Sequence, residues 1–201
     1  MMSSLYLQGL KYGDVQMTVT GMITAGLFYL ISTAKPLLTL SEAKPPASVF
    51  NISVMASILG QFTVHLGCLV LVLYLCNGQN GTTSAVFDVD YPLADSKFHP
   101  SVVNSAVYLL YTTFQVNNFL VNYRGPPFTQ SIWESRILLF SFFTMYALIF
   151  LVVSGVSKSL NGSLQLVPFP SPNFKSLIAA VLLGDLALTY LVEKLSQHLE
   201  K

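Results

Sequence analysis

Five long apolar stretches recur along the chain, separated by short segments that hold most of the charged residues. A helix needs about 20 apolar residues to cross the hydrocarbon core of a bilayer. Each stretch has about that length, and none shows the short alternating pattern of a barrel strand. The pattern therefore predicts an all-α membrane protein: a single transmembrane domain over residues 1–201, a bundle of five transmembrane helices at about 15–31, 50–76, 102–121, 137–156 and 174–195.

Composition agrees with this interpretation. Charged residues make up only 9% of the 201 residues, and the mean hydropathy is +0.60. Soluble domains carry roughly 25% charged residues, so this chain has too few charges to cover a surface that faces water. The net charge of +1, without a basic cluster, argues against a nucleic-acid partner.

The third stretch is the most polar of the five, and its polar residues recur at helical spacing. Steps of four, three, four, three and four residues place six of them on one helical face: Asn104, Tyr108, Tyr111, Gln115, Asn118 and Asn122. Polar groups at membrane depth are costly and usually face protein or a water-filled cavity. This face therefore either makes interhelical hydrogen bonds, worth about 0.6 kcal/mol each on average, or lines a pathway through the bundle.

Three further polar residues interrupt the apolar stretches. Gln61 and His65 lie one helical turn apart in the second stretch, and Asp185 lies within the fifth. A single histidine without a second ligand at metal spacing is weak evidence for a metal site, so we expect no metal ligands in this sequence. A carboxylate inside a membrane needs a partner or a proton, which makes Asp185 a candidate for either structural pairing or function.

Motifs of soluble catalysis are absent from the sequence. It contains no Gly-Lys-Ser/Thr phosphate loop, no Gly-x-Ser-x-Gly turn and no His-Glu-x-x-His pair. We therefore expect no catalytic residue and no bound cofactor in this chain itself. The motifs alone leave open whether the chain belongs to an enzyme.

Lysine and arginine counts predict how the chain is oriented in the membrane. One side of the predicted bundle holds six of them and the other side four, and the more basic side is normally cytosolic. This margin places the N-terminus outside the cell or in a lumen and the C-terminus in the cytosol. Two glycosylation sequons, at Asn80 and Asn161, fall on the predicted non-cytosolic side.

Several short motifs, in order along nearly the whole chain, resemble one family. They are residues 4–16 (Ser-Leu-Tyr-Leu-Gln-Gly-Leu-Lys-Tyr-Gly-Asp-Val-Gln), 44–46 (Lys-Pro-Pro), 122–128 (Asn-Tyr-Arg-Gly-Pro-Pro-Phe) and 182–185 (Leu-Leu-Gly-Asp). This set is similar to the C-terminal transmembrane region of the type V, subgroup A, P-type ATPases of the endoplasmic reticulum. The resemblance implies that the chain forms the last five membrane helices of such an enzyme.

The resemblance also carries expectations about activity. It implies the membrane support region of an ATP-driven enzyme that extracts misinserted transmembrane helices from the endoplasmic reticulum membrane or transports a cation such as manganese. ATP and Mg would be cofactors of the full-length enzyme. Asp14 and Gln16, at the start of the first predicted helix, would lie nearest the substrate groove.

The complete enzymes carry an Asp-Lys-Thr-Gly-Thr phosphorylation motif, which this sequence lacks. We therefore expect a fragment of a larger multi-pass protein of the endoplasmic reticulum membrane. Its partners would be the lipid bilayer, the remaining helices and cytosolic domains of the parent ATPase, and transmembrane-helix substrates. Two alternatives remain: a stand-alone multi-pass membrane interaction protein without catalytic activity, and a small ion carrier that uses Asp185 and His65.

Overall fold

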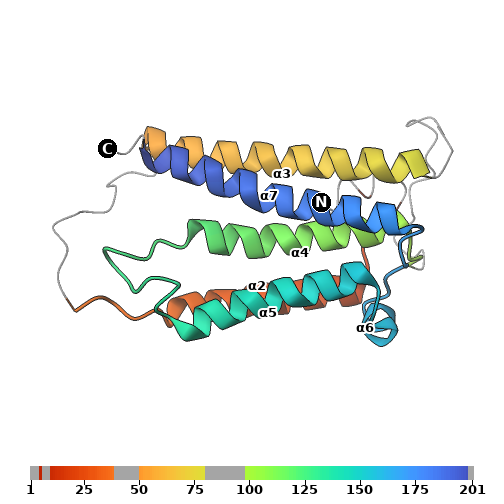
Figure 1. Ribbon diagram of the computed structural model, residues 1–201, viewed down its shortest axis with the longest axis horizontal. Helices are drawn as coiled ribbons and strands as arrows, with labels where there is room; N and C mark the ends of the chain where they lie inside the picture. Colours follow the sequence, from red (N-terminus) through yellow and green to blue (C-terminus); the bar gives the residue numbers. More distant parts are fainter. Residues whose placement is uncertain (1–4, 6–9, 39–49, 80–97, 199–201) are drawn as a thin grey trace.

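The computed structural model describes residue 5 and residues 10–38, 50–79 and 98–198. Over these residues, five long helices lie side by side along the longest axis of the molecule (Figure 1). They are α2 (Asp14–Ser32), α3 (Ile52–Gln79), α4 (Val102–Asn122), α5 (Arg136–Ser154) and α7 (Pro172–His198). The short helix α6 (Lys158–Ser163) follows α5, and the one β-type feature of the described residues is an isolated bridge between Pro36 and Thr129.

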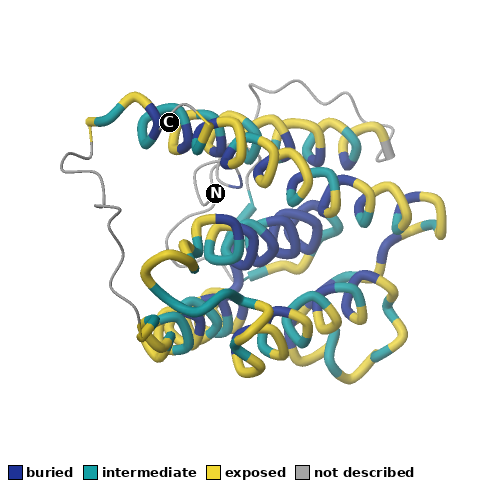
Figure 2. Tube along the Cα trace, turned by 60° about the vertical axis from the view of Figure 1, so that its left-hand side comes forward, coloured by how far each residue is buried: buried dark blue, intermediate teal, exposed yellow. Residues whose placement is uncertain are grey.

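The central helix of the bundle is α4. It contacts all four other long helices: α3 and α7 pack against each other on one side of it, and α2 and α5 lie on the other side (Figure 1). Thirteen of its residues are buried, and Figure 2 shows the buried residues concentrated in the middle of the bundle. The polar third stretch of the sequence is therefore enclosed by the more apolar ones.

Four of the helices in the described residues are long and apolar enough to cross a membrane: α2, α3 over Ile52–Gly78, α5 and α7. Their outward surfaces carry large exposed apolar side chains, such as Phe28, Tyr74 and Phe140. A helix at the centre of a bundle touches protein rather than lipid and needs no apolar surface, which explains why α4 is not among the four. The chain is an all-α membrane protein, but composition supports four of the five predicted spans.

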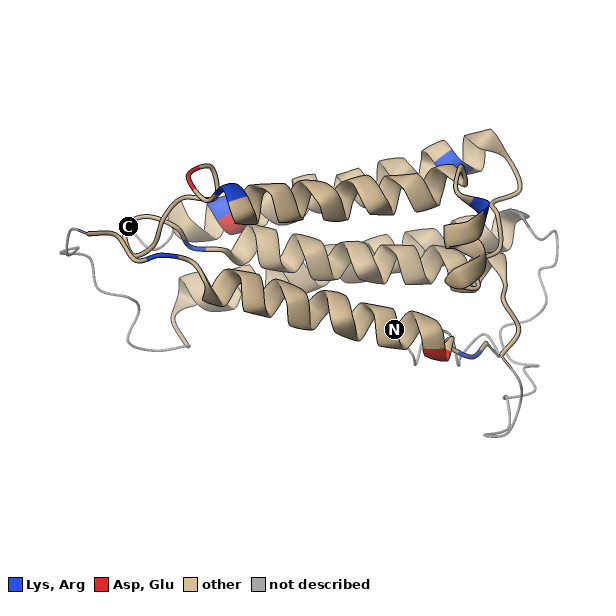
Figure 3. Cartoon of the chain, turned by 90° about the horizontal axis from the view of Figure 1, so that it is seen from below, with Lys and Arg blue, Asp and Glu red and all other residues tan. Residues whose placement is uncertain are grey.

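Charged side chains lie mostly at the two ends of the helices (Figure 3). The long middle of the bundle, where the helices run together, is almost free of them. This distribution suits a bilayer that covers the middle of the helices and leaves their ends in the polar headgroup region or in water.

Candidate functional site

One polar cluster, which we call the Asp185 junction, joins four helices near the middle of the bundle. The carboxylate of Asp185 on α7 is fully buried. It accepts a hydrogen bond from Asn117 Nδ2 on α4 at 2.7 Å, and its other oxygen lies 2.8 Å from His65 Nδ1 on α3. The hydroxyl of Tyr146 on α5 donates to Asn117 Oδ1 at 2.5 Å. The junction therefore connects α3, α4, α5 and α7 through consecutive side-chain contacts.

The surroundings of His65 fix its orientation. Its ring stacks against Phe114 of α4, with 4.3 Å between the ring centroids. His65 and Asp185 form the one ion-pair contact found in the described part of the chain. Each oxygen of the Asp185 carboxylate thus has a side-chain partner on a neighbouring helix, as a buried carboxylate requires.

A second cluster, the Glu193 junction, lies two turns further along α7. Glu193 is 4% exposed and accepts hydrogen bonds from the Ser57 hydroxyl, from Gln61 Nε2 at 3.2 Å and from Gln197 Nε2 at 2.9 Å. Gln61 also exchanges hydrogen bonds with the Asn122 amide, each 3.0 Å long. The Glu193 junction thus ties α3 to both α7 and α4.

Beside the Glu193 junction, α3 and α7 approach closely at a glycine. A Cβ atom added to Gly60 would lie 2.6 Å from Cγ1 of Val192, which is shorter than any normal contact. Small residues allow helices in membranes to approach closely. The two carboxylates and Gly60 together hold α3 and α7 in one register.

The side of α4 that faces α2 is built differently. Gln16, which is fully buried, donates through Nε2 to Asn104 Oδ1 at 2.9 Å and to the Leu164 carbonyl at 3.2 Å. Asn104 in turn donates to the Lys11 carbonyl at 3.2 Å. These contacts fasten the start of α2 to the start of α4 and to the segment after α6. The side-chain oxygen of Gln16, Oε1, has no hydrogen-bond partner among the described residues.

The two predicted groove residues therefore have different surroundings. Asp14 is the first residue of α2 and is exposed, whereas Gln16, half a turn later, is buried against α4. Of this pair, Asp14 alone is open to an approaching molecule.

An open hollow of about 510 Å³ lies between α2 and α4, beyond the contacts of Gln16. Its polar lining comes from Tyr12, Thr20 and Thr24 on the α2 side and from Tyr111 and Gln115 on α4. The hydroxyl of Tyr12 is buried without a hydrogen-bond partner among the described residues.

The six polar residues predicted to share one face of α4 do not all face the same neighbour. Asn104 contacts α2, Gln115 lines the hollow, and Asn122 bonds to Gln61 on α3. Asn118 is exposed, and its side-chain oxygen accepts a hydrogen bond from Asn122 at 2.6 Å. Sequence reasoning missed Asn117, the α4 residue that binds Asp185.

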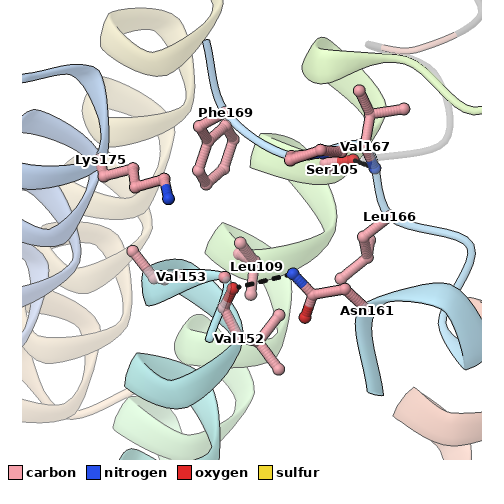
Figure 4. A pocket seen from close by; sticks show the side chains of 11 residues that line it. Ser105, Leu109, Val152, Val153, Asn161, Leu166, Val167, Phe169 and Lys175 are labelled. Atoms are coloured by element: carbon pink, nitrogen blue, oxygen red, sulfur yellow. Dashed lines mark hydrogen bonds between the residues drawn. The ribbon is translucent and has the colours of Figure 1, made fainter. Parts of the chain in front are cut away.

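A much smaller cavity lies at one end of the bundle, beside α6 (Figure 4). Its volume of about 10 Å³ is near the minimum for one water molecule. Next to it, Lys175 Nζ donates to the Ser154 carbonyl at 2.9 Å and Asn161 Nδ2 donates to the Val152 carbonyl at 3.3 Å. The amide nitrogen of the Asn161 sequon is therefore already used in a contact with α5. The Asn80 sequon lies outside the described residues.

Metal ligands do not gather in the described part of the chain, where no group of three His, Cys, Asp or Glu side chains is placed to hold an ion. Cys68 and Cys76 are buried free thiols. The hydrogen-bonded arrangement of the described polar residues suits the holding and spacing of helices.

Comparison with known proteins finds relatives along nearly the whole chain. It is 35% identical to an endoplasmic reticulum transmembrane helix translocase of Schizosaccharomyces pombe over 96% of its length. It is 33% identical to the corresponding translocase, spfA, of Aspergillus fumigatus over 98% of its length, and 38% identical to the probable manganese-transporting ATPase PDR2 of Arabidopsis thaliana over 84%. The chain spans only about 15% of the length of these relatives. No protein-family model matches it.

Proposed function

Because this chain belongs to the type V P-type ATPases and matches their C-terminal membrane region, we propose that it braces the membrane domain of an ATP-driven helix translocase. The location that follows from the relatives is the membrane of the endoplasmic reticulum, crossed several times. In this function the chain performs no chemistry on ATP. It provides a fixed set of helices beside the part of the enzyme that moves.

The observation that carries this proposal is the pair of junctions on α7. Asp185 and Glu193 are both buried, and each accepts hydrogen bonds from more than one side chain. Lipid gives packed helices no hydrophobic driving force for association, so interhelical hydrogen bonds and close packing hold them together. Satisfied junctions of this kind favour a brace over an ion pathway, which needs groups that can release their partners.

The brace requires that α4 also crosses the bilayer, as a fifth span. Its 21 residues extend about 30 Å at 1.5 Å per residue, which equals the hydrocarbon thickness. Its amides face neighbouring helices, where they are protected from lipid. With the N-terminus of the chain on the lumenal side, five spans place the C-terminus in the cytosol, as the count of basic residues predicts.

The substrate-facing part of the chain, in this proposal, is the start of α2. Asp14 is exposed there and lies beside the positive end of the helix dipole. Gln16 fixes the position of this segment through Asn104. We therefore assign Asp14 to the groove and Gln16 to its support.

The name of the Arabidopsis relative suggests manganese transport as a second activity. Since no ligand set for a cation is present in the described residues, we assign no step of such transport to this chain. The residues that would handle ATP, Mg or a transported cation belong to other parts of the relatives in this proposal.

A chimera tests the proposal. The chain would replace the matching region of the Saccharomyces cerevisiae translocase, to which it is 31% identical, in a strain that lacks the yeast enzyme. We expect the chimera to restore extraction of a mislocalised tail-anchored protein and substrate-stimulated ATPase activity. A chimera that inserts and folds but restores neither would refute the proposal.

The role of Asp14 is tested in the same chimera. Asp14→Asn should reduce substrate stimulation of the ATPase while leaving basal ATPase activity intact, and Gln16→Ala should act more weakly through the position of α2. If both variants keep full stimulation, the groove assignment is wrong.

A further inference from the structure

The small cavity beside α6 is bounded by a tight turn that follows this helix. Gln165 has a positive φ of 54°, and the amide of Leu166 donates to the Asn161 carbonyl at 2.9 Å. A residue in the left-handed conformation turns the chain back at the end of a helix. The next amide, that of Val167, donates to the Ser105 hydroxyl of α4 at 2.8 Å. These bonds fix the segment after α6 against α4, with a cavity of about 10 Å³ beside it.

Two polar side chains line this cavity from different helices, Lys175 from α7 and Asn161 from α6 (Figure 4). Lysine has three N–H donors on Nζ, and within the described residues Lys175 uses one of them, toward the Ser154 carbonyl. Asn161 donates through Nδ2 to the Val152 carbonyl, whereas its Oδ1 is buried without a hydrogen-bond partner in the same part of the chain. The lining therefore offers spare donors on Lys175 and a spare acceptor on Asn161.

The position of the Lys175 ammonium group depends on a glycine. Gly155, which ends α5, has a positive φ of 72° and also lines the cavity. A Cβ atom added to it would lie 3.2 Å from Lys175 Nζ, which is tighter than most contacts of a real Cβ. The glycine thus lets the ammonium group come close to the last carbonyl groups of α5, which have no partner within their own helix. The charge is held at the wall of the cavity.

The two side chains restrict what the cavity can bind. A cation would be repelled by the ammonium group of Lys175. An anion would lie against the lone pairs of Asn161 Oδ1, which cannot donate to it. A neutral molecule that both donates and accepts hydrogen bonds suits both groups. A volume of about 10 Å³ is about the space that one water molecule needs, and it admits nothing larger.

We infer that this cavity is the binding site of a single structural water molecule, which donates to Asn161 Oδ1 and accepts from Lys175 Nζ. Buried waters typically make about three hydrogen bonds to polar groups that otherwise lack partners. Both side chains also bond directly to carbonyl groups at the end of α5. The water therefore completes a link between the end of α5, α6 and the start of α7, and it does so whatever the function of the chain.

Magnetisation transfer from water, measured by NMR, tests this inference. The chain is labelled at its valine and leucine methyl groups and studied in detergent micelles. The methyl groups of Leu109, Val153 and Leu166 line the cavity. Those of Leu110 and Val116, which are fully buried in α4 away from the lining, are the controls. Nuclear Overhauser effects in the laboratory and rotating frames distinguish a bound water from bulk water by their relative sign.

We expect cross-peaks between water and the cavity methyl groups, with the sign of a long-lived bound water, and none at the control methyl groups. Asn161→Leu replaces the acceptor by a group of similar size and should abolish them. Asn173→Leu, at an exposed asparagine of α7, is the matched control and should leave them unchanged.

Absence of the cross-peaks in the unmodified chain would overturn the inference, because the cavity would then be dry. Their persistence in Asn161→Leu would also overturn it, since they would then arise from exchanging protons of Lys175 or Ser105. If Asn161→Leu does not fold, a high-resolution crystal structure of the unmodified chain decides instead. A density peak within hydrogen-bond distance of both Asn161 Oδ1 and Lys175 Nζ would support the inference, and a cavity without this peak would refute it.

Discussion

On the side of α4 that faces α3 and α7, the carboxylates at membrane depth have several partners on other helices, whereas on the side that faces α2 the polar groups are only partly matched. Asp185 and Glu193 each accept at least two contacts from neighbouring side chains. The side-chain oxygen of Gln16 and the Tyr12 hydroxyl have no hydrogen-bond partner in the described residues. Both sides lie in one chain and contact one central helix.

The difference shows what holds a membrane bundle in register. Lipid is as apolar as leucine, so apolar contacts alone do not select one helix arrangement. The α3–α4–α7 side is specified by polar atoms that must all be matched at once. On the α2 side, fewer polar atoms have hydrogen-bond partners, and a hollow lies between α2 and α4. On this side another helix can therefore add contacts, or α2 can shift.

The largest expected loss of stability comes from removing the Asp185 junction. Asp185→Ala leaves the buried Asn117 amide and the partly exposed His65 ring without their shared partner, and since an orphaned buried polar group costs about 1–3 kcal/mol, we expect a loss of about 2–4 kcal/mol. Reversible unfolding of the chain by SDS in mixed micelles, followed by circular dichroism, measures it. Asp14→Ala, at an exposed carboxylate, is the matched control, and an equal loss in both variants would show that the junction is not special.

A smaller loss is expected from disturbing the close approach of α3 and α7. In Gly60→Ala the new Cβ meets Cγ1 of Val192, a β-branched side chain that cannot easily rotate away, so we expect a cost of about 1–3 kcal/mol. Adding Val192→Ala should recover most of it. Gly67→Ala, where nothing lies within 4 Å, should be tolerated in the same unfolding measurement. Failure of the rescue would contradict the proposed clash.

Two adjacent asparagines of α4, one facing the α3–α7 side and one exposed, should differ in their effect on stability. Asn117→Leu removes the bridge between Asp185 and Tyr146 and should cost about 1–2 kcal/mol. Asn118→Leu replaces an exposed amide and should change stability by less than about 0.5 kcal/mol. The two variants are compared by their free energies of unfolding. If Asn118→Leu lowers this free energy more than Asn117→Leu does, the assignment of Asn117 to the inward face of α4 is wrong.

These neighbouring amides also show where sequence reasoning ends. The length of the apolar stretches placed long helices close to the observed ones, because a membrane span needs a fixed length. The cost of polar groups in lipid was enough to mark Gln61, His65 and Asp185 as residues that need partners. The step of three and four residues selected Asn118 over Asn117, since periodicity describes a face of one helix and says nothing of which helix lies opposite.

Pairings between helices were the part that the sequence could not supply. The contact of His65 with Asp185 joins residues 120 positions apart, and it depends on how α3 and α7 pack. The role of Gly60 could not be predicted either, because no sequence pattern indicates that this glycine lies against Val192 of another helix. The hollow depends on the relative positions of α2 and α4. The different surroundings of Asp14 and Gln16, which are close in the sequence, depend on the same packing.

The smallest expected effect compares two glutamines that occupy opposite sides of the bundle. Gln16 donates two hydrogen bonds through its amide nitrogen, to Asn104 and to the Leu164 carbonyl, and Gln16→Leu should cost about 0.6–1.2 kcal/mol, because one interhelical hydrogen bond in a membrane protein is worth about 0.6 kcal/mol on average. Gln61 bonds with Ser57, Asn122 and Glu193, so Gln61→Leu should cost clearly more in the same micelle unfolding measurement. Because the residue type and the substitution are the same, helix propensity and side-chain volume cancel between the two variants. A loss for Gln16→Leu that equals or exceeds the loss for Gln61→Leu would mean that the α2 side is held as firmly as the α3–α7 side, and the distinction between a braced side and an open one would have to be abandoned.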